Sequence, residues 1–279
     1  MDTFLASDGL RLRYVVDDFT DPWRASETLV LLHAAMGSST RFYAWVPHLC
    51  RHFRVVRLDQ RGHGQSEIPR APEELTIERL AADVIELLDH LGCERVHLAG
   101  SSAGAIIAQQ VTLTYPARIR SLAIFAAAAG LTPSNVDYGK WVATIKALGV
   151  RGFLAESIRD RVDPARTDPG FVEWFLDESG KTSPKLLALF VPMMGGVDLR
   201  DRLGEIRCPT LVVVPGGDPI HSVSQYEVLR ERIANVEFVV YESLAHNITD
   251  YAADRCAEEL KRFLLRHSQC AVVGAVRGA

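Results

Sequence analysis

Short apolar segments alternate with amphipathic ones along the first part of the chain, and this alternation predicts strands separated by helices. Apolar runs of strand length lie at residues 28–33, 53–58, 95–99 and 121–125. Because these runs are continuously apolar, they suit strands that are covered on both faces. Residues 77–91 instead place their leucines and valines on one side of a helix, which Gly92 ends. Such β-α-β alternation is typical of a parallel sheet with helices on both faces.

The rhythm changes after Gly130. Residues 132–203 show no clear strand, and helical stretches at 141–146, 153–159, 171–177 and 186–191 are separated by glycines and prolines. The alternation resumes with a strand at 210–214, a helix at 223–233, a strand at 236–241 and an amphipathic helix at 253–265. At the start of the chain, residues 3–6 and 11–16 predict two strands that flank a turn at Asp8-Gly9.

These elements predict an α/β fold, a mostly parallel doubly wound sheet with an inserted helical cap. The chain of 279 residues is long enough for one large domain with such an insertion. We predict the first part of the core at residues 1–130, the cap at 131–204, the second part of the core at 205–268 and a frayed tail at 269–279.

The segment Gly100-Ser101-Ser102-Ala103-Gly104 lies between a predicted strand and a predicted helix. A glycine, any residue, a serine, any residue and a glycine in that place form the pattern of a nucleophile elbow. The turn is so tight that Ser102 is expected to adopt a strained backbone conformation, with its hydroxyl above the sheet. Because a serine hydroxyl is a poor nucleophile without help, the elbow predicts a base and an acid elsewhere.

Strand, elbow, helix, late acid and final histidine together resemble the α/β-hydrolase family over nearly the whole chain. The run 57–131 is most similar to small bacterial hydrolases of enol-lactones, such as 3-oxoadipate enol-lactonase. The resemblance implies that Ser102 is the nucleophile, Asp218 the acid and His246 the base, in the family's chain order. His246 would take the proton of Ser102, while Asp218 would orient the imidazole and stabilise its cation.

The notable alternatives are a different place for the acid and a different histidine for the base. Some members of the family place the acid after the strand that follows the elbow helix, but here that place holds four alanines, residues 126–129. Asp218 is therefore the remaining candidate, although it could also be an ordinary turn residue beside Pro219. His63, in Arg61-Gly62-His63-Gly64, is interpreted as part of a turn beneath the site rather than as a second base.

The resemblance also predicts an oxyanion hole made of two backbone N–H groups, those of Ala103 and Ala35. The family usually has His-Gly in the second loop, where this chain has His33-Ala34-Ala35.

Four residues are candidates for substrate binding: Arg41, Trp45, Trp141 and Trp174. Arg41 and Trp45 follow the loop His33-Ala34-Ala35, which we call the oxyanion loop, and Trp141 and Trp174 come from the predicted cap. Arg41 is the best cation for a substrate carboxylate, although a surface arginine is the commoner outcome.

Composition narrows the range of partners. The formal net charge of -4 argues against nucleic acid, and no apolar run is long enough to span a bilayer. The five cysteines have no zinc or redox spacing, which favours reduced thiols in a cytoplasmic protein. We therefore expect a small-molecule substrate, no cofactor and no metal, with the oligomeric state undetermined and a homodimer left open.

The sequence thus predicts a serine hydrolase of a small carboxylic ester or lactone. Hydrolysis of an amide or of a carbon–carbon bond beside a ketone stays open, because the same triad serves those reactions. A hypothesis of another class is a ligand receptor that keeps the fold.

Overall fold

A single eight-stranded sheet runs through the centre of the computed structural model, which describes residues 2–131 and 135–268. The strands lie in the order β1-β2-β4-β3-β5-β6-β7-β8. β1 pairs with β2 and β2 with β4 in antiparallel fashion, and the other neighbours are parallel. The strands are β1 (Asp2–Leu5), β2 (Arg11–Asp17), β3 (Thr28–Leu32), β4 (Arg54–Leu58), β5 (Val96–Ser101), β6 (Ile119–Phe125), β7 (Thr210–Pro215) and β8 (Val236–Tyr241). This confirms the predicted α/β class, while the predicted tail at 269–279 lies outside the described residues.

The central strands are buried on both faces, as their continuous apolar runs predicted. In β3, Leu29 and Leu31 join the apolar core on one face, whereas Val30 and Leu32 join the core on the other. This division follows from the two-residue period of a strand, which sends successive side chains to opposite faces. One sheet therefore organises two separate cores.

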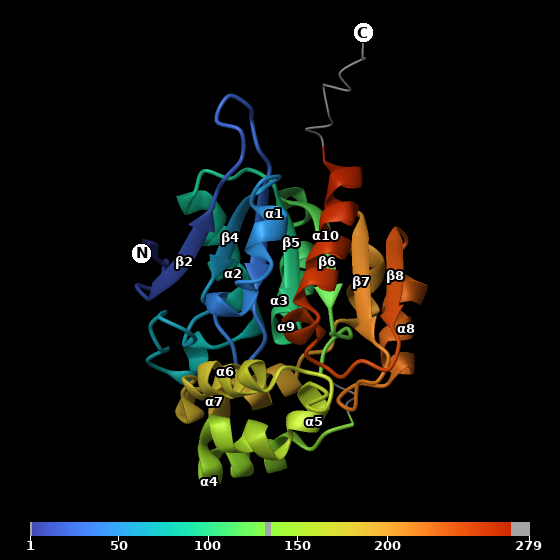
Figure 1. Ribbon diagram of the computed structural model, residues 1–279. Helices are drawn as coiled ribbons and strands as arrows, with labels where there is room; N and C mark the ends of the chain where they lie inside the picture. The colour runs from blue at the N-terminus through green and yellow to red at the C-terminus, as the bar shows by residue number, and fades with distance from the viewer. Residues whose placement is uncertain (1, 132–134, 269–279) are drawn as a thin grey trace.

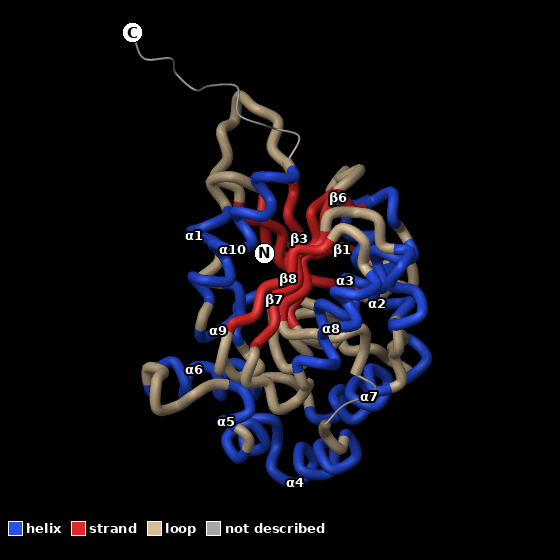
Figure 2. The backbone as a smooth tube through the Cα atoms, turned by 90° about the vertical axis from the view of Figure 1, so that its right-hand side faces the viewer, coloured by secondary structure: helices blue, strands red, loops and turns tan. Residues whose placement is uncertain are grey.

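Helices cover each of these cores, so the sheet is the middle of three layers (Figure 2). α2 (Ile77–His90), α3 (Ala103–Thr114) and α8 (Val223–Arg232) pack on one face. α1 (Val46–Leu49), α9 (Ile248–Tyr251) and α10 (Ala253–His267) pack on the other. α2 begins where the Thr76 side chain accepts a hydrogen bond from the N–H of Arg79, which satisfies a free donor of the first turn.

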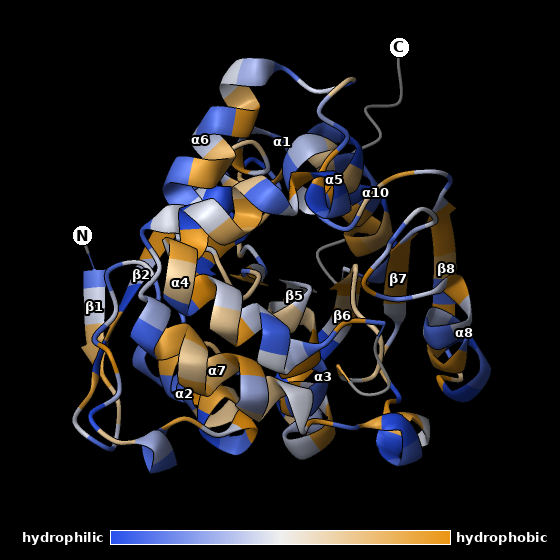
Figure 3. Ribbon diagram, turned by 90° about the horizontal axis from the view of Figure 1, so that it is seen from below, coloured by the Kyte–Doolittle hydropathy of each residue, from blue (hydrophilic) through white to orange (hydrophobic). Residues whose placement is uncertain are grey.

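The segment between β6 and β7 forms a group of helices at one end of the sheet (Figure 1). These are α4 (Tyr138–Glu156), α5 (Ile158–Arg161), α6 (Pro169–Gly180) and α7 (Pro184–Gly195). Pro169 and Pro184 open α6 and α7, where a missing N–H costs nothing. Hydrophilic and hydrophobic residues are mixed on these helices when they are seen from below (Figure 3), as expected for helices that cover a core on one side only.

Short elements account for most differences from the predicted pattern. Gly149 separates two helical pieces of α4, as predicted, because its φ of 72° and ψ of 172° are non-helical and kink the segment. Neither α1 nor α9 was predicted, because one turn of helix shows no periodicity. The same holds for the 3₁₀ turns η1 (Ser39–Phe42), η2 (Pro72–Glu74), η3 (Pro116–Arg118) and η4 (Arg200–Glu205).

Among the described residues, no helix combines the length and apolar character needed to cross a membrane.

Candidate active site

Ser102 lies at the sharp turn between the end of β5 and the start of α3. Its backbone has φ 51° and ψ −120°, which confirms the predicted strain, because side-chain-bearing residues rarely adopt positive φ. The two glycines explain how the turn closes. A Cβ on Gly100 would lie 2.4 Å from the carbonyl oxygen of Gly104, and a Cβ on Gly104 would lie 2.3 Å from that of Leu32. Only hydrogen fits at both positions, so strand and helix approach closely and Ser102 projects from the turn.

We expect Gly104→Ala to destabilise the fold by about 2–4 kcal/mol, because the added methyl meets backbone that cannot rotate away. Urea unfolding measures the change in the free energy of unfolding. Gly196→Ala is the matched control, since a Cβ there has its nearest neighbour at an ordinary 3.5 Å. Equal stability of the two variants would contradict the close approach of α3 to β3.

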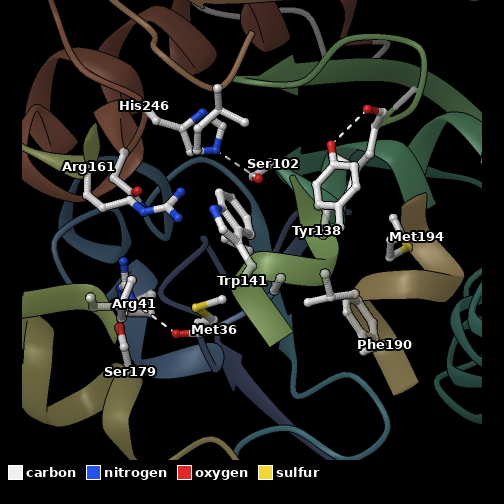
Figure 4. A pocket seen from close by; sticks show the side chains of 18 of the residues that line it. Met36, Arg41, Ser102, Tyr138, Trp141, Arg161, Ser179, Phe190, Met194 and His246 are labelled. Atoms are coloured by element: carbon white, nitrogen blue, oxygen red, sulfur yellow. Dashed lines mark hydrogen bonds between the residues drawn. The ribbon is translucent and has the colours of Figure 1, made fainter. Parts of the chain in front are cut away.

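The structure brings Ser102, His246 and Asp218 together from three loops that follow β5, β8 and β7. The Ser102 hydroxyl lies 3.0 Å from His246 Nε2 (Figure 4), and His246 Nδ1 lies 2.8 Å from Asp218 Oδ2. Because Nδ1–H donates its hydrogen bond to Asp218, Nε2 is left as the acceptor for the Ser102 hydroxyl. This arrangement can remove a proton from Ser102 as its oxygen attacks.

Asp218 is held as an anion although it is buried. Its Oδ2 accepts hydrogen bonds from His246 and from the Tyr226 hydroxyl, and its Oδ1 accepts the N–H of Ile220 at 2.8 Å. Burial by itself raises the pKa of this carboxyl. The charge of His246 and the hydrogen bonds lower that pKa by more than burial raises it, so the net pKa is below its ordinary value. Sequence analysis missed Tyr226. Its position near the start of the helix that follows Asp218 was the available signal.

The loop that follows β3 lies beside the elbow. Ala34, Ala35 and Ala103 line the same pocket as Ser102. Ala103 is the first residue of α3, so its N–H has no acceptor within the helix. Among the described residues, positive φ at a residue other than glycine occurs at Ser102, Ala126 and Ser243. Alanine in place of the family's glycine at position 34 therefore brings no backbone strain.

Two buried histidines contact backbone carbonyl oxygens of the loop that follows β3. His33 Nδ1 lies 2.8 Å from the carbonyl oxygen of Ala34, and His63 Nε2 lies 2.5 Å from that of Ala35. Burial lowers the pKa of both imidazoles, which favours their neutral forms. His63 thus contacts the loop rather than the Ser102 hydroxyl, in keeping with its interpretation as a residue beneath the site.

An apolar pocket lies between the elbow and the cap, with an open volume of about 660 Å³ that includes solvent at its mouth. Trp141 lines it, as predicted, and so does Arg41 (Figure 4). Its wall is formed by Ala34, Ala35, Met36, Arg41, Ser102, Ala103, Leu131, Tyr138, Trp141, Leu154, Arg161, Phe175, Ser179, Phe190, Val191, Met194, Ile220, His246 and Asn247. Nine of these residues come from α4, α5, α6 and α7, so the cap supplies about half of the wall.

The charge of Arg41 is already compensated. Its Nε donates to Asp250 Oδ1 at 2.5 Å, and its Nη1 donates to the Ser179 hydroxyl at 2.7 Å. The guanidinium also lies 4.1 Å over the Phe175 ring. Arg41 therefore joins η1 to α6 and to α9, and it is not the free cation that the sequence suggested.

Two of the predicted substrate-binding residues do not line the pocket. Trp45 is 1% exposed and packs against Phe42 and Phe125 in the core on the α10 face. Trp174 packs against Tyr43 and lines a separate surface groove. The prediction was wrong for both, because sequence spacing places these side chains near the oxyanion loop and the cap without giving their direction.

Sequence analysis also missed Arg161, a buried pocket residue, because the predicted helix stopped at residue 159. In the part of the chain that the structure describes, its Nε and Nη2 have no hydrogen-bond partner. Within the described part of the chain, no three histidine, cysteine, aspartate or glutamate side chains gather in a group that could hold a metal ion.

The chain is similar to known hydrolases over most of its length. The profile of the alpha/beta hydrolase fold family matches residues 27–171. A 3-oxoadipate enol-lactonase of Acinetobacter baylyi is 26% identical over 71% of this chain and 75% of its own. The crystal structure of a hydrolase from Pseudomonas aeruginosa superposes with a TM-score of 0.82 and 31% identity, covering 94% of this chain and 97% of its own. An enol-lactonase from Burkholderia xenovorans shares the fold, with a TM-score of 0.85 and 24% identity over 94% of this chain and 99% of its own.

Proposed function

The chain belongs to the α/β-hydrolase fold family and is a hydrolase; from that premise we propose that it cleaves a small carboxylic ester or lactone through an acyl-enzyme on Ser102. The observation that carries the proposal is the hydrogen-bonded series of Ser102, His246 and Asp218 at an apolar pocket. The similarity to an enol-lactonase supports the lactone as one form of the substrate.

In the acylation half of the reaction, the Ser102 oxygen attacks the carbonyl carbon while His246 Nε2 takes the hydroxyl proton. The carbonyl π electrons move to oxygen, and the N–H groups of Ala103 and Ala35 bind the resulting oxyanion. When the tetrahedral intermediate collapses, the bond to the leaving oxygen breaks and His246 donates its proton to that oxygen. The acyl group stays on Ser102, and Asp218 stabilises the imidazolium throughout.

Deacylation repeats these steps with water. His246 takes a proton from water as the hydroxide oxygen attacks the acyl carbon, and the same N–H groups bind the second oxyanion. Collapse breaks the bond to Ser102, which regains its proton from His246. An ester gives a separate alcohol and acid, whereas in a lactone both groups remain on one molecule.

A fluorophosphonate probe tests this proposal without knowledge of the substrate. Such probes phosphonylate serines that are activated by a base, so we expect Ser102 to be labelled within minutes at equimolar probe. Peptide mass spectrometry locates the adduct, and heat-denatured protein is the control that should remain unlabelled. If Ser102 stays unlabelled in the folded protein while a small ligand binds tightly, the receptor hypothesis is favoured instead.

A further inference from the structure

Arg161 is a cation in the wall of the pocket for which the described residues provide no ion-pair partner. It is the last residue of α5, and it is only 6% exposed. It lines the pocket together with Ser102 and His246, and its guanidinium points into the space between His246 and Trp141 (Figure 4). Neither Nε nor Nη2 has a hydrogen-bond partner among residues 2–131 and 135–268, although both atoms are buried. A buried, unpaired donor is costly to a fold, so its presence in a ligand pocket calls for a physical reason.

The two carboxylates that act electrostatically on the Arg161 guanidinium form no ion pair with it. Asp160 and Asp218 favour its charged form, but Asp218 is bonded to His246 and Tyr226. Burial lowers the pKa of Arg161 to about 10, which still leaves it protonated at neutral pH. The described residues that line the pocket include no aspartate or glutamate. Arg41 shows the contrast, because it lies in the same wall with Asp250 as its partner.

The position of Arg161 is well defined. Its guanidinium lies 4.7 Å over the Trp141 ring and 5.8 Å over the Phe153 ring, so the cation rests on aromatic faces. Its carbonyl oxygen accepts the N–H of Asn247 at 2.9 Å, one residue beyond His246. The backbone thus couples Arg161 directly to the loop that carries the proposed base.

We propose that the substrate carries a carboxylate, separate from the bond that is cleaved, and that this carboxylate pairs with Arg161. The inference rests on the proposed hydrolysis at Ser102. A guanidinium presents parallel N–H groups that match the two oxygens of a carboxylate. Asn247 Oδ1, another buried wall atom without a partner, is an acceptor and so cannot bind the anion. Leu154, Val191 and Met194 make the wall apolar, which suits a short hydrocarbon spacer between the carboxylate and the reacting carbonyl.

Two methyl esters of equal shape test the charge directly. Monomethyl glutarate carries a carboxylate where methyl 5-methylhexanoate carries an isopropyl group, and released acid is measured by mass spectrometry. We expect kcat/KM to be at least about tenfold higher for the charged ester, since a charge-assisted hydrogen bond contributes that much or more.

Arg161→Met should lower kcat/KM for the charged ester by about 10–100-fold and change that for the neutral ester by less than about threefold. Arg159→Met is the matched control, because Arg159 lies exposed on the same short helix, and it should alter neither value. Equal losses on both esters, or no loss on the charged one, would overturn the inference.

Thermal unfolding separates a binding role from a structural one. Removing an unpaired buried charge should leave the Tm of Arg161→Met equal to or above that of the unchanged protein, because no ion pair is broken. If the Tm falls by several degrees and kcat/KM falls equally for both esters, Arg161 supports the structure of the cap, and the proposal is contradicted.

A binding measurement distinguishes failure of this inference from failure of the proposed function. In the Ser102→Ala background, calorimetry should detect monomethyl glutarate, and Arg161→Met should weaken its binding by about 10–100-fold. If turnover of the neutral ester requires Ser102 but monomethyl glutarate does not bind, only the inference about Arg161 fails. Binding that depends on Arg161, without turnover of any ester, would remove the proposed function and leave the carboxylate site.

Discussion

Replacing Ser102 with alanine is expected to reduce kcat for hydrolysis of 4-nitrophenyl acetate by roughly 10⁴–10⁶-fold. The variant has no oxygen to form the acyl-enzyme, and His246 Nε2 loses its hydrogen-bond partner at 3.0 Å. What remains is the slow attack of water in a pocket that still offers the proposed oxyanion donors. Release of 4-nitrophenolate measures the loss, and a fluorophosphonate probe should no longer label the elbow peptide.

The control for this variant lies one residue away. The Ser101 hydroxyl is bonded to that of Thr249 at 2.7 Å, whereas the His246 ring is bonded to Asp218 and Ser102, so Ser101→Ala should retain activity within about tenfold. Ser102→Ala keeps a Cβ at φ 51°, so its Tm should stay close to that of the unchanged protein. A folded Ser102→Ala protein with undiminished esterase activity would show that another residue is the nucleophile.

The parts of the site that sequence predicts well are those fixed by order along the chain. Ser102, Asp218 and His246 each follow a strand, and the carboxyl ends of parallel strands meet at one edge of a sheet. The family resemblance indicated which three residues to consider, and the order of the strands explains why they lie in the same place. The strands themselves were recognisable because burial on both faces leaves a continuous apolar run.

The residues that sequence misjudged depend on the direction of a side chain. Trp45 and Trp141 are both large and apolar, yet the first is in the core on the α10 face and the second lines the pocket. Arg41 and Arg161 differ because Asp250 lies beside only one of them, and that aspartate is 209 residues away in the chain. Periodicity carries no information on such distant neighbours, so the cap and its cations needed the structure.

The two arginines in the pocket wall differ in the charge that they present to a ligand. Arg41 and Asp250 form a closed pair that ties η1 to α6 through Ser179, and it presents little net charge to a ligand. Arg161 keeps an uncompensated charge, which the aromatic faces beneath it stabilise only in part. A substrate that neutralises Arg161 would therefore bind in one orientation, with its reacting carbonyl toward Ser102.

Asp218→Asn is the second variant for which we expect a very large effect, a loss of about 10⁴-fold in kcat. Asp218 Oδ2 accepts from two donors, His246 Nδ1 and the Tyr226 hydroxyl. Its Oδ1 accepts the N–H of Ile220 as well, so an amide in either orientation turns its NH₂ group, which has no lone pair to offer, toward either Ile220 N–H or His246 Nδ1–H. His246 can then bond to the amide by accepting at Nδ1, which places its proton on Nε2, where it can no longer take the proton of Ser102.

The rate of fluorophosphonate labelling measures this effect apart from deacylation, since labelling needs the same proton transfer. It should fall by a factor similar to that in kcat, with the far-ultraviolet circular dichroism unchanged. Tyr226→Phe is the control, because it alters the same carboxylate with a smaller expected loss of activity. It removes one donor and raises the pKa of Asp218 toward its ordinary value, yet the carboxyl stays ionised at neutral pH, so activity should fall by no more than about tenfold. If Asp218→Asn instead retained a tenth of the activity, a carboxylate other than Asp218 would be orienting His246.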